Sequence, residues 1–216
     1  SYFKAVAGEL WLETESMSKV NGRKAYNFVT TVKSSDVFSM FYSVDDRAET
    51  FVDYESMTPS VFRLQVKESS QVGESKAFFD PIKQVATFWN VTTNKSDGRK
   101  EKKKVWDILP YSQNVYSAAF YMRTFTYEIG KEYAFRVAND GENIIFRGKA
   151  LRKEKLKTEA GEFQTIVVKP EFEIDGYFKP VGNIYFWLTD DDRKLIVRIE
   201  SEIKIIKTQG DKIQHL

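Results

Sequence analysis

The side chains best suited to catalysis are two short runs of aspartate. Asp45-Asp46 and Asp190-Asp191-Asp192 offer paired carboxylates, which a glycoside hydrolase uses as an acid and as a nucleophile or base. Adjacent residues of a strand point to opposite faces, so neither run forms such a pair by itself. The second run is more typical of a turn in which aspartate caps its own backbone. We therefore expect no enzymatic activity, and a carboxylate-based glycoside hydrolase is the remaining catalytic alternative.

Thiol and histidine chemistry is limited by composition. The chain contains no cysteine and one histidine, His215. This removes thiol nucleophiles, Cys-rich zinc sites and nearly every histidine triad or cluster. The Asp190-Asp191-Asp192 triplet could bind calcium through carboxylate oxygens, but it lacks the spacing and the glycine of an EF-hand. We expect no metal site and no cofactor.

Arginines set among aromatic residues are stronger candidates, for binding rather than catalysis. A guanidinium can hold a carboxylate or phosphate of a glycan or lipid through two parallel hydrogen bonds. The alternative is that these arginines form structural ion pairs with nearby carboxylates. The arginines are Arg47, Arg123, Arg193 and Arg198. Arg47 and Arg123 are the two expected to bind such a group, and Asp46, Asp53 or Glu200 would pair with them in the alternative.

Aromatic side chains are unusually frequent, with 17 Phe and 11 Tyr among 216 residues. This bias favours strands, and an exposed ring could stack on a sugar. A tryptophan in an alternating strand is nevertheless more often part of the core. The aromatic candidates are Trp89, Trp106, Tyr121 and Trp187; with Arg47, Asp53, Arg123 and Arg198 they form the predicted ligand-binding set.

The overall charge is nearly balanced, with 33 basic and 31 acidic residues. This balance argues against general nucleic-acid binding. One basic run lies in a predicted hairpin loop around 94–104. It is either a patch for phosphate, lipopolysaccharide or an acidic membrane surface, or a solvated hairpin tip whose charges discourage edge aggregation. No apolar run approaches the roughly 20 residues of a membrane helix, so we do not expect a transmembrane protein.

Alternation of apolar and polar residues dominates the chain and predicts strands. Asn21-Gly22 and Asn139-Asp140-Gly141 are strong hairpin turns between such segments. The clearest strand carries Leu195, Val197 and Ile199 on one face. The predicted strands are 8–17, 26–32, 48–54, 61–66, 76–80, 84–92, 131–137, 143–154, 163–169 (ending at Pro170), 181–189 and 195–205.

Two segments have helical spacing instead. Residues 36–44 carry apolar side chains at i, i+3, i+4 and i+7 behind Ser35 or Asp36 as N-cap. Residues 115–124 repeat this behind Ser112 or Asn114. We predict an all-β, mostly antiparallel fold, a barrel or sandwich of roughly ten or more strands, with two short amphipathic helices lying on a sheet. Residues 1–216 should form a single domain.

Several ordered sequence blocks resemble one bacterial family, known as domain of unknown function 3108. The likeness runs from about Gly8 to the C-terminus. Family members often carry proline shortly after the tryptophan block, where this chain has Leu195-Ile196. The blocks are FYSVDDRAET (41–50) with Asp53, MTPSVF (57–62), FD (79–80), YSAAFYMRT (116–124), TEAGEFQT (158–165), and WLTDD (187–191) with Arg193 and 195–201.

The resemblance implies a location rather than an activity. Such proteins usually follow a signal peptide or lipoprotein signal in Gram-negative bacteria, so it implies a periplasmic or outer-membrane-anchored protein whose signal segment has been removed. We expect a non-enzymatic cell-envelope binding protein, with an envelope glycan as ligand. Alternatives are a lipid or lipoprotein carrier with an apolar cavity closed by the helices, and a structural module that binds a protein partner.

Overall fold

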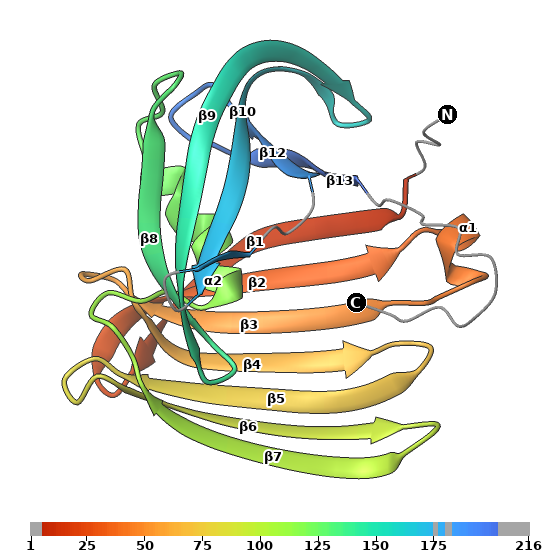
Figure 1. Cartoon of the computed structure of the whole chain (residues 1–216), viewed down its shortest axis with the longest axis vertical. Helices are drawn as coiled ribbons and strands as arrows, with labels where there is room; N and C mark the ends of the chain where they lie inside the picture. Colours follow the sequence, from red (N-terminus) through yellow and green to blue (C-terminus); the bar gives the residue numbers. More distant parts are fainter. Residues whose placement is uncertain (1–5, 175–176, 180–182, 203–216) are drawn as a thin grey trace.

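In the computed structural model, which describes residues 6–174, 177–179 and 183–202, the chain forms two antiparallel sheets (Figure 1). The seven-stranded sheet follows chain order: β1 (Gly8–Val20), β2 (Arg23–Ser34), β3 (Asp45–Asp53), β4 (Pro59–Lys67), β5 (Gln71–Asp80), β6 (Val85–Asn94) and β7 (Gly98–Asp107). The second sheet has the order β13 (Ile196–Glu202), β12 (Asn183–Thr189), β10 (Gly161–Ile174), β9 (Glu142–Thr158) and β8 (Glu132–Asn139), with β11 (Tyr177–Lys179) beside β10. The helices are α1 (Asp36–Ser39), α2 (Val115–Tyr121) and the 3-10 turn η1 (Met122–Thr124). Both sheets have open edges, so the predicted antiparallel β fold is confirmed as a sandwich-like arrangement rather than a closed barrel.

Two predicted hairpin turns are confirmed by their backbone angles. Asn21 and Gly22 have φ of 50° and 79°, and Asp140 and Gly141 have φ of 47° and 90°. Two consecutive residues with positive φ match the twist of the flanking strands, which is why Asn-Gly and Asp-Gly are favoured there. These turns fix the register of the β1–β2 and β8–β9 hairpins.

Two strand predictions need correction. Pro170 does not end β10, which continues to Ile174 and pairs Pro170 with Gly148 of β9. On its other side β10 pairs with β12 only over 165–168. Pro170 lies outside this ladder, so its missing N–H costs no hydrogen bond to β12. The basic run lies mainly on strand β7 rather than in a loop. The sequence pattern did not predict β7, because this edge strand carries charged residues on both faces and therefore shows no apolar–polar alternation.

Helix α1 is shorter than predicted and does not pack on a sheet. It spans four residues, Asp36–Ser39, and buries none of them. Ser35 is the N-cap, as one reading of the sequence expected, and accepts a hydrogen bond from the backbone N–H of Phe38. The apolar spacing of 36–44 therefore does not reflect a buried helical face.

Helix α2 is the second predicted helix, and Asn114 is its N-cap. The Asn114 side chain accepts hydrogen bonds from the backbone N–H groups of Tyr116 and Ser117, and the Ser117 hydroxyl accepts one from the Asn114 N–H. This capping box satisfies donors that would otherwise be buried without partners.

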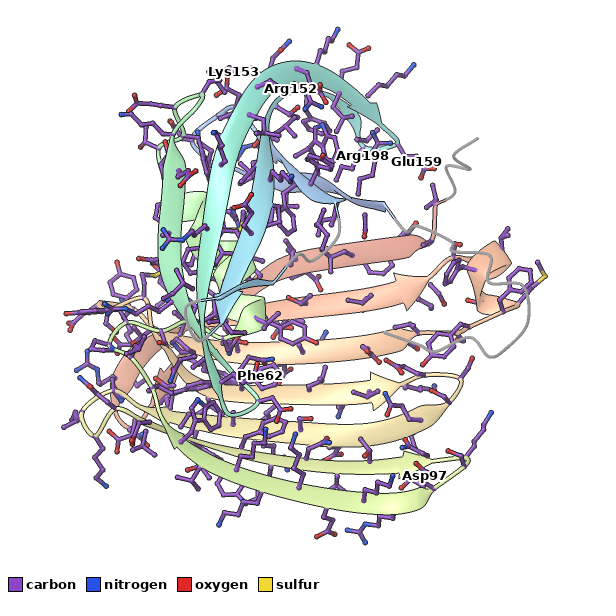
Figure 2. The ribbon with its side chains drawn as sticks, in the orientation of Figure 1. Phe62, Asp97, Arg152, Lys153, Glu159 and Arg198 are labelled. Atoms are coloured by element: carbon purple, nitrogen blue, oxygen red, sulfur yellow. The ribbon has the colours of Figure 1, made fainter. Side chains whose placement is uncertain are left out.

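Helix α2 lies between the sheets and contributes to the core of both. Phe120 stacks on Phe28 of β2 with ring centroids 4.1 Å apart, and Tyr116 lies 5.2 Å from Phe62 of β4. Ala118 and, from the following η1 turn, Met122 pack instead with the buried side chains of the second sheet. The face of the seven-stranded sheet that carries Phe62 is called the inner face below (Figure 2), and the opposite one the outer face.

The segment before α2 also joins the two sheets. Gln113 is almost fully buried, and its backbone exchanges hydrogen bonds with Arg136 and Ala138 of β8. Its side-chain amide donates to the carbonyl of Met57, in the β3–β4 turn, at 2.7 Å. One residue thus links the backbones of both sheets.

Some predictions lie beyond the described residues, namely the strand residues from Ile203 to Ile205, the strand start at Val181, and His215. Within the described part of the chain, no helix has the length and apolar composition needed to cross a bilayer.

Asn114→Ala should lower the free energy of unfolding by about 1–2 kcal/mol, because the N–H groups of Tyr116 and Ser117 lose their acceptor in a buried place. Denaturant unfolding measures this loss. Asn114→Ser is the matched control, since serine supplies a capping oxygen of similar strength. Equal destabilisation by alanine and serine would show that the cap is not the source of the effect.

Candidate functional site

The predicted ligand-binding residues do not meet in a single site. Arg47 and Trp89 lie on the outer face of the seven-stranded sheet, and Trp106 lies on its inner face. The remaining candidates lie elsewhere: Asp53 at the end of β3, Tyr121 and Arg123 on α2 and η1, and Trp187 and Arg198 on β12 and β13.

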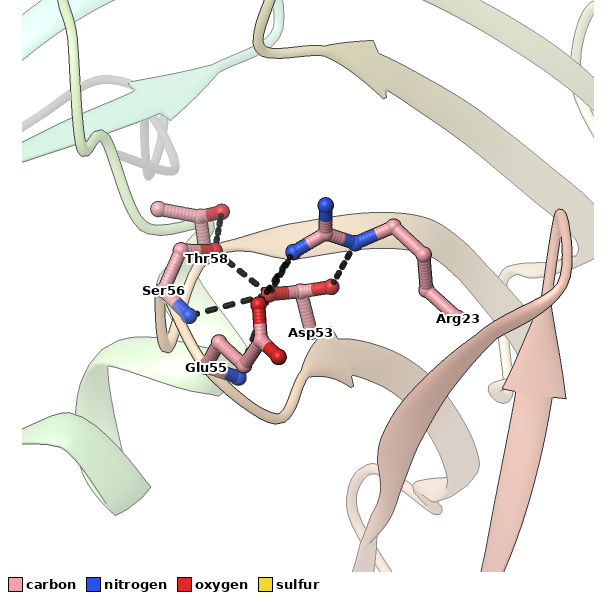
Figure 3. A network of polar contacts seen from close by, with 5 residues as sticks. All are labelled: Arg23, Asp53, Glu55, Ser56 and Thr58. Carbon is pink, nitrogen blue, oxygen red and sulfur yellow. Dashed lines mark hydrogen bonds and ion pairs between the residues drawn. The ribbon is translucent and has the colours of Figure 1, made fainter.

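Asp53 is held in a network that shapes the β3–β4 turn (Figure 3). Arg23 donates to its two carboxylate oxygens at 2.6 and 3.1 Å. The backbone and hydroxyl of Ser56 each donate to Asp53 Oδ1 at 2.9 Å. The Arg23 hydrogen bond, followed by those from Ser56, keeps the pKa of Asp53 well below its usual range. With all of these partners, Asp53 supports a turn rather than facing a ligand.

Three aromatic candidates are built into the core. Tyr121 meets Phe125 and Phe135 edge to face at 5.4 and 5.3 Å. Trp106 packs beside the buried cluster of the inner face. Trp187 is only 5% exposed, and its indole N–H donates to Glu154 at 2.6 Å. Trp187 is therefore closed to a sugar, and Tyr121 and Trp106 are half-buried against core side chains.

The Asp190-Asp191-Asp192 run is a turn, as its sequence suggested. Asp191 accepts hydrogen bonds from the Thr189 hydroxyl at 2.6 Å and from the Arg193 guanidinium at 3.0 and 2.7 Å. These partners, Thr189 first, lower the pKa of Asp191 to about 2. Arg123 donates to the carbonyl of Arg193 at 3.0 Å, so it braces the same turn. Burial and the nearby charge of Arg193 lower the pKa of Arg123.

A second polar cluster surrounds Trp187 on the second sheet. The guanidinium of Arg198 lies 5.6 Å from the centre of the Trp187 ring, and Arg152 donates to Glu154 at 2.7 Å. Figure 2 shows Arg152 and Arg198 on the strands of this sheet. The hydrogen bonds from Arg152 and then Trp187 lower the pKa of Glu154. Trp187 and Arg198 were among the predicted residues. Arg152 and Glu154 were not, because in the sequence they look like ordinary surface charges of a strand.

The outer face brings Arg47 and Trp89 onto one surface. In the strand register, Arg47 lies beside Gln65, and Gln65 lies beside Glu74. Arg47 also donates to Glu15 at 3.0 Å and to Glu49 at 3.3 Å, which orients its guanidinium. Arg47, Gln65 and Glu74 line a shallow hollow of about 790 Å³ that extends to Arg99 on β7.

An exposed aromatic pair lies next to this hollow. Trp89 is 37% exposed and meets Phe78, 49% exposed, edge to face at 5.6 Å. The ammonium of Lys103 lies 5.3 Å from the centre of the Trp89 ring. Lys76 stands beside Trp89 on the neighbouring strand. We call Phe78, Trp89, Lys76 and Lys103 the aromatic platform. Phe78 was missed because the adjacent Phe78 and Phe79 point to opposite faces, and sequence cannot tell which face is covered.

No metal centre is evident in the part of the chain that the structure describes. Within it, no three His, Cys, Asp or Glu side chains come together as a metal site. Asp45 and Asp46 occupy neighbouring positions on β3 and therefore point to opposite faces. Burial, followed by the nearby charges of Glu68 and Asp45, raises the pKa of Asp46, while a backbone hydrogen bond from Lys67 opposes this.

Comparison with known proteins identifies the family. The sequence model described as "Protein of unknown function (DUF3108)" matches residues 1–208, nearly the whole chain, so the protein belongs to this family. No curated protein and no solved structure matches the chain.

Asp53→Asn should lower the free energy of unfolding by about 1 kcal/mol at pH 7, since Arg23 is largely exposed and solvent screens the pair. The carboxyl of Asp53 has a lower pKa in the folded than in the unfolded protein. Its contribution is therefore complete above the ordinary carboxyl pKa of about 4 and declines as the pH falls further. Denaturant unfolding at pH 7 and pH 3 should show a smaller gap between wild type and variant at pH 3.

The control for this change is Glu55→Gln. Glu55 also pairs with Arg23, at 3.1 Å, but it is exposed, so its loss should cost a few tenths of a kcal/mol at most. A gap for Asp53→Asn that is independent of pH would contradict the ionic origin of the effect.

Proposed function

We propose that this member of the DUF3108 family is a non-enzymatic binding protein of the bacterial cell envelope whose outer face binds an envelope glycan with anionic groups. The observation that carries the proposal is the exposed Phe78–Trp89 pair beside a polar hollow.

The aromatic platform suits the apolar faces of sugar rings. Two exposed aromatic side chains on a sheet are costly to leave in water, and stacking against the C–H faces of a sugar would bury them. The sheet holds the rings in place, so little conformational entropy is lost on binding. Lys103 and Lys76 place positive charge beside the rings, which favours an acidic sugar or a phosphorylated one.

The hollow suits the hydroxyl groups of a glycan. Arg47, Gln65 and Glu74 are planar polar groups held side by side by strand pairing, and together they offer several donors and acceptors. Arg99 on β7 adds a further cation at the far side of the hollow. A chain of sugars lying across β3 to β7 would reach the hollow and the aromatic platform together.

Lipid or lipoprotein carriage fits these surfaces less well. The hollows of about 360 and 790 Å³ are lined mainly by polar and charged side chains, whereas a lipid carrier needs an apolar cavity. Helix α1 buries no residue, and α2 is part of the core, so these helices do not close over a cavity in the way that such a carrier would require.

The proposed location is the periplasm or the periplasmic side of the outer membrane, which family resemblance implies. Fractionation of the source cells with periplasmic and outer-membrane markers tests it, and recovery with cytosolic markers would refute it. A protein partner in the envelope is the alternative to a glycan, and cross-linking in cells distinguishes the two.

Trp89→Ala should weaken glycan binding about tenfold, the loss typical of a well-placed aromatic anchor. The measurement is calorimetric titration with soluble peptidoglycan fragments and with lipopolysaccharide-derived oligosaccharides. Trp11→Ala is the matched control, because Trp11 is a comparably exposed tryptophan of the outer face, on β1 and away from the platform. The proposal would be refuted if the wild type bound neither the peptidoglycan fragments nor the oligosaccharides.

Lys103→Gln should weaken binding of the acidic oligosaccharide and reduce its dependence on salt, while binding of a neutral dextran fragment should change little. The reason is that the substitution removes a cation beside Trp89 but leaves the ring in place. Titrations at low and high ionic strength measure both effects. An unchanged salt dependence would remove the argument for an anionic ligand.

A further inference from the structure

A separate apolar surface lies at the end of the seven-stranded sheet away from α2, where α1 connects β2 to β3 (Figure 1). Val37, Met40 and Phe41 are 66%, 75% and 82% exposed, and Phe38 is also exposed. Val6 adjoins this segment, because its carbonyl accepts a hydrogen bond from the Ser35 hydroxyl at 2.9 Å. We call these five side chains the apolar tip. Large side chains this exposed and this close together usually mark an interaction surface.

Hydrogen bonds to the neighbouring strands and turns fix the backbone that carries the apolar tip. The Ser34 hydroxyl lies 2.6 Å from that of Ser39 and accepts from the backbone N–H of Val44 at 3.0 Å. The Tyr42 hydroxyl donates to Glu68 at 2.6 Å and also contacts Ser70 at 2.8 Å, which fixes the connection against the β4–β5 turn. The polar side chains thus point back to the sheet while the apolar ones point to solvent.

Three lysines surround the base of the apolar tip. Lys33, Lys67 and Lys95 line a hollow of about 360 Å³ that also includes Asp36 and Ser39 of α1. None of the three lysines has an ion-pair partner within the described residues. Asp36, Asp45 and Glu68 also line the hollow, but Glu68 is engaged by Tyr42 and Gln71. Long lysine side chains can extend past these carboxylates to meet an anionic surface.

We propose that the apolar tip docks the protein onto a lipid bilayer surface. Val37, Met40 and Phe41 would enter the boundary between headgroups and acyl chains, and Lys33, Lys67 and Lys95 would contact headgroup phosphates. Apolar side chains that protrude beside cations match the composition of an interfacial lipid anchor. Docking there leaves the aromatic platform of the outer face free. Lys67 lines both this hollow and the one assigned to the glycan, so Trp89 rather than Lys67 distinguishes the two surfaces.

The test is co-sedimentation of the full chain with vesicles made of phosphatidylethanolamine and phosphatidylglycerol. The wild type should bind, and Phe41→Ser should raise the lipid concentration needed for half-maximal binding at least fivefold. Ile82→Ser is the matched control: Ile82 is 92% exposed but lies in the β5–β6 turn, so its loss should leave binding unchanged. Lys33→Gln with Lys67→Gln should weaken binding and flatten its salt dependence.

Two results of this experiment would overturn membrane docking, and further measurements identify another occupant or serve as controls. Failure of the wild type to sediment with these vesicles overturns the proposal, as does equal weakening by Phe41→Ser and Ile82→Ser. A wild-type dimer in solution that Phe41→Ser converts to a monomer would assign the apolar tip to a second copy of the chain instead. Thermal melting should show wild-type stability for Phe41→Ser, because this side chain contributes nothing to the core. Trp89→Ala should bind vesicles normally, which separates this test from that of glycan binding.

Discussion

The architecture depends on one short buried segment, Gln113 and Asn114 followed by α2. The apolar inner face of the seven-stranded sheet and the face of the second sheet that carries Ile166 and Leu188 both need cover that neither sheet provides by itself. Helix α2 and η1 fill the space between them, because Phe120 and Tyr116 contact one sheet while Ala118 and, from η1, Met122 contact the other. Burying a helix start in this place requires its backbone donors to be satisfied, which the Asn114 capping box achieves. The Gln113 side chain then bonds to the opposite sheet, so packing and hydrogen bonding reinforce each other.

Because the core forms at one end of the seven-stranded sheet, the two surfaces proposed to bind ligands lie away from it. The aromatic platform uses the outer face, which the second sheet does not cover. The apolar tip lies at the end farthest from α2. The backbone beneath both surfaces is held by strand pairing or by hydrogen bonds. On the two proposals, the protein would sit on a membrane while it holds a ligand from the envelope.

Charged residues in this protein mostly stabilise local geometry. Arg23 and Asp53 hold the β3–β4 turn, and Asp191 holds the β12–β13 turn through Thr189 and Arg193. Lys102 of the basic run pairs with Asp140 in the turn of the second sheet at 2.7 Å. The edge strand β7 therefore carries charges that oppose strand addition and also connect the two sheets. The lysines around the apolar tip differ in lacking such partners among the described residues.

The sequence by itself determined the features that depend on neighbouring residues. Alternation of apolar and polar residues predicted most strands. Residues that readily adopt positive φ, such as Asn21 and Gly22, predicted the positions of hairpin turns. The turn at Asp191 was predicted from the tendency of aspartate to cap its own backbone. The exposure of each face was decided only by the tertiary structure. Trp89 and Trp187 both lie in alternating strands, yet one is open to solvent and the other is buried against Glu154. The physical reason is that periodicity divides a strand into two faces, whereas burial depends on which distant element covers each face. The same limit applies to α2. Its apolar spacing predicted a helix that packs on one sheet, whereas the structure places it between two.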